Sequence, residues 1–262
     1  MTGRVGRVRA ALTAVIAVFA LAAAGCGDSD DSGGSSKPRL TVSAAASLKK
    51  AFTAYGGDFS GARARFSFAG SDELAAQIRK GVRPDVFAAA NTKLPEQLYR
   101  EGKVERPVVF AGNRLILAVP ADGRTVKGLS DLSRRGAKLA VGSASVPVGS
   151  YTREVLGRLP PTQSKAILGN VRSNEPDVGG VVGKLSQGAA DAGFVYVTDV
   201  VATRGRVKAV ELPKSLQPSV RYGAAVVKGA KQPKQAKRFI DGLLTGKGLE
   251  TMDAAGFEPS PR

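Results

Sequence analysis

A strand meets a helix in the stretch Phe66-Ser67-Phe68-Ala69-Gly70-Ser71-Asp72-Glu73-Leu74-Ala75-Ala76-Gln77-Ile78. The alternation of Phe66 and Phe68 with polar neighbours predicts a short strand. Gly70 predicts a turn, and Ser71 is a residue type that often caps the start of a helix. Two acidic residues follow in the first turn, where the helix dipole favours negative charge. Such a strand, turn and helix start can present backbone N–H groups and a hydroxyl to an anion.

The same pattern recurs on both sides of this stretch. A strand at residues 39–43 leads to Ser47 and a helix, and a strand at 84–89 leads to a helix at 92–100. Strands that alternate with helices of this length predict mostly parallel sheets covered by helices on both faces. In such sheets the ligand crevice lies beyond the carboxyl ends of the strands. Ser47 and Ser71 are both expected at those ends.

The second half of the chain predicts a second lobe. Two apolar strands, at residues 113–120 and 221–227, are expected to cross between the lobes and to form a hinge. We expect lobe 1 to comprise residues 39–117 and 222–262, lobe 2 to comprise residues 118–221, and the ligand to lie between them. The other expected elements are strands at 138–141, 192–196 and 207–212 and helices at 150–159, 177–185, 232–244 and 246–255.

Residues 1–25 have the layout of a secretory signal, which is too short and too poorly flanked for a transmembrane anchor. An arginine-containing start precedes the apolar run 10–24, and Cys26 lies at the expected cleavage point. The segment resembles a bacterial lipoprotein signal, in which the cysteine sulfur carries a lipid, although Ala23 stands where leucine is usual. Plain secretion with an incidental cysteine is the alternative. The Gly/Ser/Asp-rich residues 26–38 are expected to form a flexible tether.

The composition excludes several classes of catalytic and metal site. The chain has no histidine and a single cysteine. The absence of histidine excludes a Ser-His-Asp triad, histidine metal ligands and histidine general bases. A lipidated Cys26 would leave no thiol for a disulfide. The formal net charge is +17, but the basic residues are scattered and aromatic residues make up only 6%. We therefore expect a solvated basic surface and no nucleic-acid partner.

Several short segments, in order along the chain, resemble the periplasmic molybdate-binding proteins of ABC transporters. The resemblance covers residues 40–259. The first segments that carry it are Ala44-Ala45-Ala46-Ser47-Leu48, Phe66-Ser67-Phe68-Ala69-Gly70-Ser71, Pro84-Asp85-Val86-Phe87-Ala88-Ala89-Ala90-Asn91 and Asn113-Arg114-Leu115-Ile116-Leu117. The later ones are Val146-Pro147-Val148-Gly149, Ala190-Asp191-Ala192-Gly193-Phe194-Val195-Tyr196-Val197-Thr198-Asp199 and Gly256-Phe257-Glu258-Pro259. The resemblance implies a two-lobed α/β structure, the type II periplasmic-binding-protein fold.

The resemblance also implies an oxyanion site built from neutral groups only. In the family, two serine hydroxyls, two backbone N–H groups at helix starts and a tyrosine hydroxyl hold the anion. Carried onto this sequence, these groups belong to Ser47, Ser71, Val148, Val178 and Tyr196. Val148 stands where alanine is usual, and the family's Asn-Val-Arg helix start falls on Asp177-Val178-Gly179, where only the valine matches.

The implied function is transport without chemistry. A monomeric, lipid-anchored protein would bind molybdate, and also tungstate, and pass it to an ABC permease driven by its ATPase. It would need no cofactor and no metal coordinated directly by the protein, because molybdenum is bound as the oxyanion. Neutral donors at helix starts suit a dianion, and a cage spaced for molybdate or tungstate would hold the smaller sulfate or phosphate poorly. A site of donors alone would also offer no acceptor for the proton of hydrogen phosphate.

Other interpretations of the same residues remain open. Sulfate, phosphate or an organic acid could replace molybdate as the ligand. The serines could only cap helices, and Tyr196 could be an ordinary core tyrosine. In a different class, an exported hydrolase could use carboxylates such as Asp85 and Asp191. A structural or adhesion protein is disfavoured, because the sequence lacks internal repeats.

Overall fold

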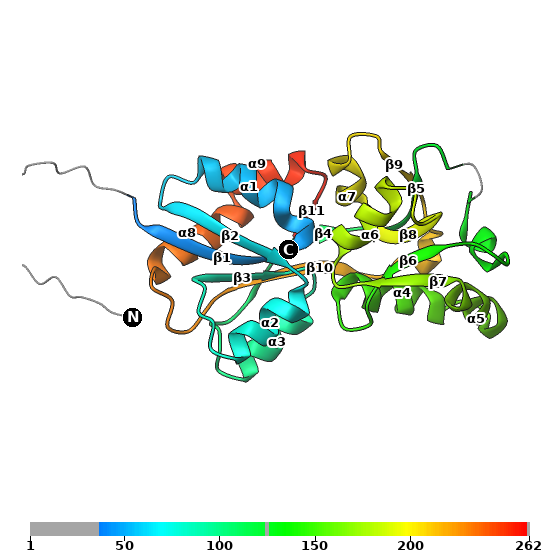
Figure 1. The fold of residues 1–262 in the computed structure, drawn as a ribbon. Coiled ribbons are helices and arrows are strands. Elements are labelled where there is room, and N and C mark those ends of the chain that lie inside the picture. Colours follow the sequence, from blue (N-terminus) through cyan, green and yellow to red (C-terminus); the bar gives the residue numbers. More distant parts are fainter. Residues whose placement is uncertain (1–36, 124–125, 261–262) are drawn as a thin grey trace, which may run out of the picture. The chain divides into compact units, whose positions relative to one another are not determined.

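The computed structural model describes residues 37–123 and 126–260. The expected signal sequence, Cys26 and nearly all of the expected tether lie outside the described residues. From Lys37 onward the chain forms one compact unit built on two β-sheets (Figure 1). Within the described residues, no helix is long and apolar enough to cross a membrane.

Within the described part of the chain, the first sheet has six strands in the order β11-β4-β10-β3-β1-β2. Its strands are β1 (Arg39–Ala45), β2 (Arg63–Ala69), β3 (Val86–Ala89), β4 (Val108–Asn113), β10 (Val220–Val226) and β11 (Glu258–Pro259). Its helices are α1 (Lys49–Asp58), α2 (Ser71–Arg79), α3 (Lys93–Arg100), α8 (Pro233–Leu244) and α9 (Gly246–Ala254). Helices α1, α8 and α9 cover one face of the sheet, and α2 and α3 cover the other (Figure 1). This two-sided cover makes most of the inner strands buried.

The second sheet has five strands among the described residues, in the order β7-β6-β8-β5-β9. They are β5 (Leu115–Pro120), β6 (Leu139–Gly142), β7 (Val171–Glu175), β8 (Ala192–Tyr196) and β9 (Val207–Val210). The helices are α4 (Pro147–Gly157), α5 (Pro161–Gly169), α6 (Val178–Ser186) and α7 (Val197–Ala202), and short 3₁₀ turns span Leu129–Ser133 and Lys214–Leu216. This sheet is also covered on both faces, by α6 and α7 and by α4 and α5 (Figure 1).

Both sheets are mixed, with a parallel part and an antiparallel part. Strands β2, β1 and β3 run parallel in the first sheet, as do β7, β6 and β8 in the second. The strands next to the points where the chain changes sheet, β10 and β4 in the first and β5 and β9 in the second, pair antiparallel. The parallel strands place their carboxyl ends, and the residues that follow them, toward the helix starts of the other sheet.

The chain changes sheet earlier than its hydrophobicity indicates. Strand β4 ends at Asn113 in the first sheet, and β5 begins at Leu115 in the second. The sequence placed this boundary after residue 117, but residues 115–118 already pair with β8. The apolar run gives no sign of the boundary because both sheets bury it. The return crossing leads into β10, which begins at Val220.

Other elements agree with the sequence in existence but differ in their ends. Helix α4 begins at Pro147, earlier than the expected residue 150, because proline is well suited to the first helical position. This places Val148 in the first turn. Helices α5 and α7 and strands β4, β7 and β11 were not expected.

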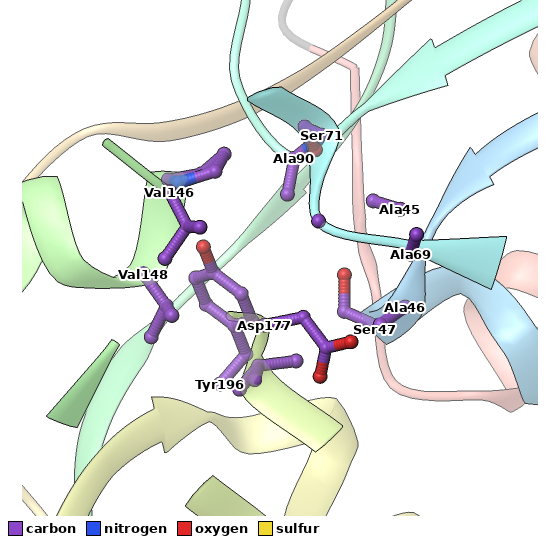
Figure 2. Close-up of a pocket in the computed structure, with 13 residues that line it drawn as sticks. Ala45, Ala46, Ser47, Ala69, Ser71, Ala90, Val146, Val148, Asp177 and Tyr196 are labelled. Carbon is purple, nitrogen blue, oxygen red and sulfur yellow. The ribbon is translucent and has the colours of Figure 1, made fainter. Parts of the chain in front are cut away.

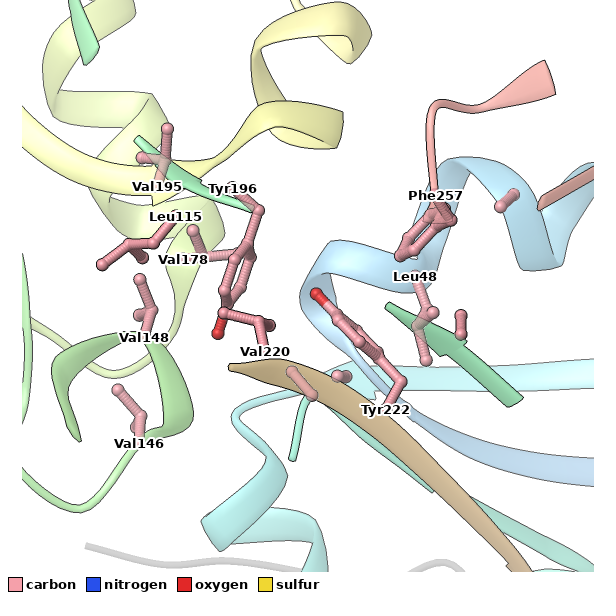
Figure 3. Packing of buried hydrophobic residues seen from close by; sticks show 14 of the residues in the cluster. Leu48, Leu115, Val146, Val148, Val178, Val195, Tyr196, Val220, Tyr222 and Phe257 are labelled. Carbon is pink, nitrogen blue, oxygen red and sulfur yellow. The ribbon is translucent and has the colours of Figure 1, made fainter. Parts of the chain in front are cut away.

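The hydrophobic core continues from one sheet to the other (Figure 3). Leu115 and Val220, at the two crossings, are buried in the same cluster as Tyr196 of β8 and Tyr222 of β10. The Tyr222 ring also packs perpendicular to that of Phe257, with centroids 5.3 Å apart. The two lobes therefore contact each other directly, through apolar side chains that surround the candidate site.

Candidate functional site

A small cavity of about 20 Å³ lies where the strand ends of the first sheet meet the helix starts of the second lobe (Figure 2). Its lining comes from three strand ends of the first sheet and three segments of the second. The residues are Ala45, Ala46, Ser47, Ala69, Gly70, Ser71, Ala90, Val146, Pro147, Val148, Asp177, Val178 and Tyr196. All five residues that the sequence proposed for the anion line this one cavity.

Ser71 is the first residue of α2 and does not cap it. Gly70 is the N-cap, and its carbonyl accepts the first helical bond from the Leu74 N–H at 3.0 Å. The expectation that Ser71 is the N-cap is therefore wrong by one residue, because the helix begins immediately after the glycine turn. The Ser71 hydroxyl oxygen instead accepts a bond from the Ala90 N–H at 3.1 Å. Its own proton is then free to donate into the cavity.

Ser47 lies in a short 3₁₀ turn, η1 (Ala46–Leu48), between β1 and α1. The N-cap of α1 is Leu48, so Ser47 caps no helix there. The Ser47 hydroxyl oxygen is 2.9 Å from the Tyr222 hydroxyl. In Figure 2 the Ser47 side chain points into the cavity from the end of β1.

Helix α4 supplies backbone N–H groups. Pro147 has no N–H, and the first helical bond is donated by Ser150 to the Val146 carbonyl at 2.9 Å. The N–H of Val148 therefore belongs to the group at the helix start that the helix itself cannot satisfy. A Cβ at Gly149 would lie 1.9 Å from the Ser143 carbonyl oxygen, so only glycine allows the end of β6 to pack this closely on the helix start.

The N-terminus of helix α6 supplies a second set of backbone N–H groups. Its N-cap is Asp177, whose Oδ1 accepts a bond from the Gly180 N–H at 3.0 Å. Val178 is the first helical residue and lines the cavity. Because the first N–H groups of a helix point outward along its axis, Val178 can offer its N–H to a bound anion.

Tyr196 ends β8 and is 1% exposed. Its hydroxyl is buried and has no hydrogen-bond partner among the described residues. Burial raises the pKa of the Tyr196 hydroxyl well above its usual value, so the group is protonated and can donate. A buried polar group without a partner costs about 1–3 kcal/mol and is uncommon. A ligand in the cavity would provide the missing acceptor.

Asp177 is the exception to the neutral lining. Within the described residues, no lysine or arginine lines the cavity, and the Asp177 carboxylate is the only charged side chain in it. The sequence comparison counted the backbone of the neighbouring Val178 and missed this side chain. Aspartate immediately before a helix is a common N-cap, and that pattern was the available signal.

The arrangement suits hydrogen bonding to an anion and does not suit bond chemistry. The two carboxylates named for a hydrolase do not line the cavity. Asp85 accepts bonds from the Thr41 hydroxyl at 2.7 Å and the Gln232 N–H at 2.8 Å, and Asp191 accepts one from the Lys138 N–H at 2.8 Å. Both carboxylates therefore hold backbone in place. The described residues also include no cluster of acidic, cysteine or histidine side chains that could hold a metal ion.

The chain is similar to known bacterial solute-binding proteins. A family model described as "Bacterial extracellular solute-binding protein" matches residues 40–258. The molybdate-binding protein ModA of Mycobacterium tuberculosis H37Rv is 34% identical over 224 residues, covering 83% of this chain and 84% of that protein.

Solved structures show the same fold at lower identity. The periplasmic molybdate-binding protein of Azotobacter vinelandii matches with a TM-score of 0.76 and 22% identity, covering 85% of this chain and 100% of that chain. The sulfate-binding protein SubI of Mycobacterium tuberculosis matches with a TM-score of 0.75 and 18% identity, covering 85% and 87%. Proteins of this fold therefore include binders of different oxyanions.

Proposed function

The chain belongs to the bacterial extracellular solute-binding protein family, and we propose that it captures molybdate, and also tungstate, for an ABC importer. Family members and the curated relatives are solute-binding proteins of transporters, not enzymes. The solute is a ligand and not a cofactor. The proposal places the oxyanion in the cavity between the two sheets, bound by Ser47, Ser71, Val148, Val178 and Tyr196.

The observation that carries the proposal is the buried Tyr196 hydroxyl, which has no partner among the described residues and belongs to a residue lining a cavity with other donors. Two serine hydroxyls, whose oxygens already take part in hydrogen bonds, and two helix starts surround the same space. A tetrahedral dianion has four oxygens that accept several hydrogen bonds each. Neutral donors and helix dipoles can hold it strongly without a lysine or arginine, which would be left unpaired in the empty site.

Both lobes contribute donors, and this suggests how capture is coupled to delivery. Ser47 and Ser71 belong to the first lobe, and the other three residues belong to the second. An anion that binds both sets favours the closed arrangement of the lobes. We propose that the closed, loaded monomer docks on a permease, whose ATPase drives release and import.

Cys26 is proposed to anchor the protein to the outer face of the cell membrane through a lipid. The support is the sequence alone, with an apolar run and small residues directly before the cysteine. Mass spectrometry of the native protein should show an N-terminal, lipid-modified Cys26. An unmodified cysteine would refute the anchor, and the binding proposal would be unaffected.

Hydrogen phosphate is a second candidate ligand, favoured by one observation. The Asp177 carboxylate lines the cavity and could accept the proton that hydrogen phosphate carries. A fully ionised oxyanion would gain nothing from this carboxylate and would be repelled by it. The two candidates therefore predict opposite effects of neutralising Asp177.

Calorimetric titration of residues 37–262, the compact unit, tests the proposal. Molybdate, tungstate, sulfate and phosphate are titrated separately at one pH and ionic strength. We expect one-to-one binding of molybdate and tungstate and much weaker binding of the other two. Tight binding of phosphate or sulfate alone would keep the cavity as the site and change the ligand. Heat from none of the four would contradict the proposed oxyanion function.

A further inference from the structure

We propose that Tyr222 is a positioning residue that holds the Ser47 hydroxyl as a hydrogen-bond donor to the ligand. Tyr222 is fully buried and does not line the cavity, so it can act on a bound anion only through Ser47. The inference rests on the proposed oxyanion function and adds a residue that the family resemblance did not name.

The argument begins with Asn113, at the end of β4. Its Oδ1 accepts a bond from the Arg114 N–H at 2.9 Å, which determines which end of the amide is oxygen. Its Nδ2 is therefore the atom that lies 2.9 Å from the Thr198 hydroxyl oxygen and 3.3 Å from the Tyr222 hydroxyl oxygen. An amide NH₂ group can only donate, so both hydroxyl oxygens accept from it.

The direction of the next bond follows. The Tyr222 oxygen accepts from Asn113, and its single proton is left for the Ser47 oxygen at 2.9 Å, which is its other partner among the described residues. Burial raises the pKa of the Tyr222 hydroxyl well above its usual value, which keeps that proton in place. The Tyr222 ring cannot turn away easily, because it packs against Phe110, Tyr196 and Phe257.

Ser47 is consequently an acceptor from Tyr222 and has its own proton free. Ser47 lines both this cavity and a larger groove, but only the cavity is also lined by the other four proposed binding residues (Figure 2). The Ser71 proton is also free, because the Ser71 oxygen accepts its hydrogen bond from the Ala90 N–H. Both serines are thus held as donors, one by the backbone and the other by Tyr222.

This chain of hydrogen bonds connects both lobes. Thr198 belongs to α7 of the second lobe, Asn113 ends β4 at the first crossing, and Tyr222 lies in β10 just after the return crossing. The orientation of the Ser47 proton therefore depends on the segments where the chain changes sheet. Asn113 and Tyr222 therefore both orient the Ser47 donor and lie where the two lobes are connected.

A double-mutant cycle tests whether Tyr222 acts through Ser47. Tyr222→Phe, Ser47→Ala and the double variant of residues 37–262 are titrated with molybdate. We expect Tyr222→Phe to raise Kd about 5- to 20-fold, because a free serine proton samples several directions. In the Ser47→Ala background the same change should have almost no effect. In a Ser71→Ala background, Tyr222→Phe should still raise Kd by the full factor.

Tyr55→Phe is the matched control. Tyr55 is also a buried tyrosine, but its hydroxyl donates to the Phe239 carbonyl at 3.1 Å, away from the cavity. This variant should leave Kd unchanged. An equal loss of affinity from Tyr222→Phe with and without Ser47, or no loss at all, would overturn the inference.

A ligand-free measurement separates this inference from the proposed function. In nuclear magnetic resonance spectra, the Tyr222 hydroxyl proton should exchange slowly and show contacts to the Ser47 β-protons. Ser47→Ala should shift this signal and speed its exchange, whereas Ser71→Ala should not. A signal indifferent to Ser47 would overturn the inference even in a protein that binds molybdate. A wild-type protein that binds no molybdate would contradict the proposed function while leaving this result to decide the role of Tyr222.

Discussion

Tyr196 and Tyr222 pack their rings edge to face between the two lobes, with centroids 5.9 Å apart and ring planes at 66°. Figure 3 shows them side by side, one from β8 and the other from β10. Their hydroxyls differ in environment. The Tyr222 hydroxyl lies within hydrogen-bonding distance of Ser47 and Asn113, whereas the Tyr196 hydroxyl has no partner among the described residues. Because of this difference, we propose that Tyr222 orients the Ser47 hydroxyl, whereas Tyr196 donates a hydrogen bond directly to the ligand.

Tyr196→Phe should weaken molybdate binding without destabilising the empty protein. The substitution removes a donor that only the ligand can satisfy, so Kd should rise about 5- to 100-fold. The unfolding free energy of the empty protein should stay equal or increase, because a buried unpartnered hydroxyl is removed. Titration and urea unfolding measure the two quantities. Tyr55→Phe should show the reverse pattern, and a large stability loss in Tyr196→Phe would argue that its hydroxyl has a structural role.

Asp177→Asn should tighten molybdate binding about tenfold. The change removes a negative charge from the lining of a site for a dianion, and an asparagine oxygen can still cap α6. The affinities of the variant for molybdate and phosphate are compared in parallel titrations. A gain for molybdate supports the fully ionised ligand. Unchanged molybdate affinity together with a loss of phosphate binding would support hydrogen phosphate as the ligand.

Gly70→Ala should hinder the approach of the two lobes. A Cβ at Gly70 would lie 2.5 Å from the carbonyl oxygen of Pro176, which belongs to the other lobe. The Pro176 segment would have to move away, so molybdate affinity should fall several-fold because closure is less favourable. Gly57→Ala is the matched control, because a Cβ there meets nothing within 4 Å. Equal affinities of the two variants in calorimetry would show that this close contact is unimportant for binding.

Asp199 should make stability depend on pH. Burial is the main cause that raises its pKa from 3.8 to about 7, the Asp177 charge adds to the rise, and the bond from the Tyr196 N–H opposes it. Between about pH 4 and about pH 7 the folded protein therefore keeps a proton that the unfolded chain has lost. The contribution of this proton to stability is complete below the unfolded pKa and is lost as pH rises through the folded pKa.

The comparison with Asp199→Asn isolates this contribution, since an amide oxygen can still accept from the Tyr196 N–H. Urea unfolding at about pH 5, 6, 7 and 8 should show the wild type losing stability relative to the variant as pH rises. Parallel curves for the two proteins would mean that Asp199 does not hold its proton in this range.

The association rate should fall with ionic strength. A groove that shares Ala46 and Ser47 with the cavity is also lined by four basic side chains, and these are Lys49, Lys50, Arg204 and Arg206. Positive charge along the way to an anion site raises the rate of capture more than the final affinity. In stopped-flow measurements, Lys50→Glu should slow association several-fold at low salt and leave dissociation nearly unchanged. Lys234→Glu, at an exposed residue of α8, makes the same charge change away from the groove and should have little effect.

The sequence predicted the strand ends and helix starts of the site, because local patterns mark them. The stretch that ends at Ser71 indicated a strand, a turn and a helix start, and the structure has β2, Gly70 and α2 in that order. Ser47 was likewise expected at a strand end, where parallel strands place functional residues, whereas Tyr196 was named by the family resemblance. Val148 and Val178 were named by the family resemblance, and both line the same cavity.

By itself the sequence therefore determined the alternation of strands and helices and the absence of histidine chemistry, since these follow from residue type and short spacing. The neutral character of most donors was implied by the family resemblance. The tertiary structure alone decided which hydroxyls are satisfied. Ser47 and Tyr222 are separated by 175 positions, yet their oxygens are 2.9 Å apart. The same packing of the two lobes places Asp177 in the lining and leaves the Tyr196 hydroxyl without a partner among the described residues. Hydrogen-bond partners depend on distances of a few tenths of an ångström between segments far apart in the chain, and no local pattern records such distances.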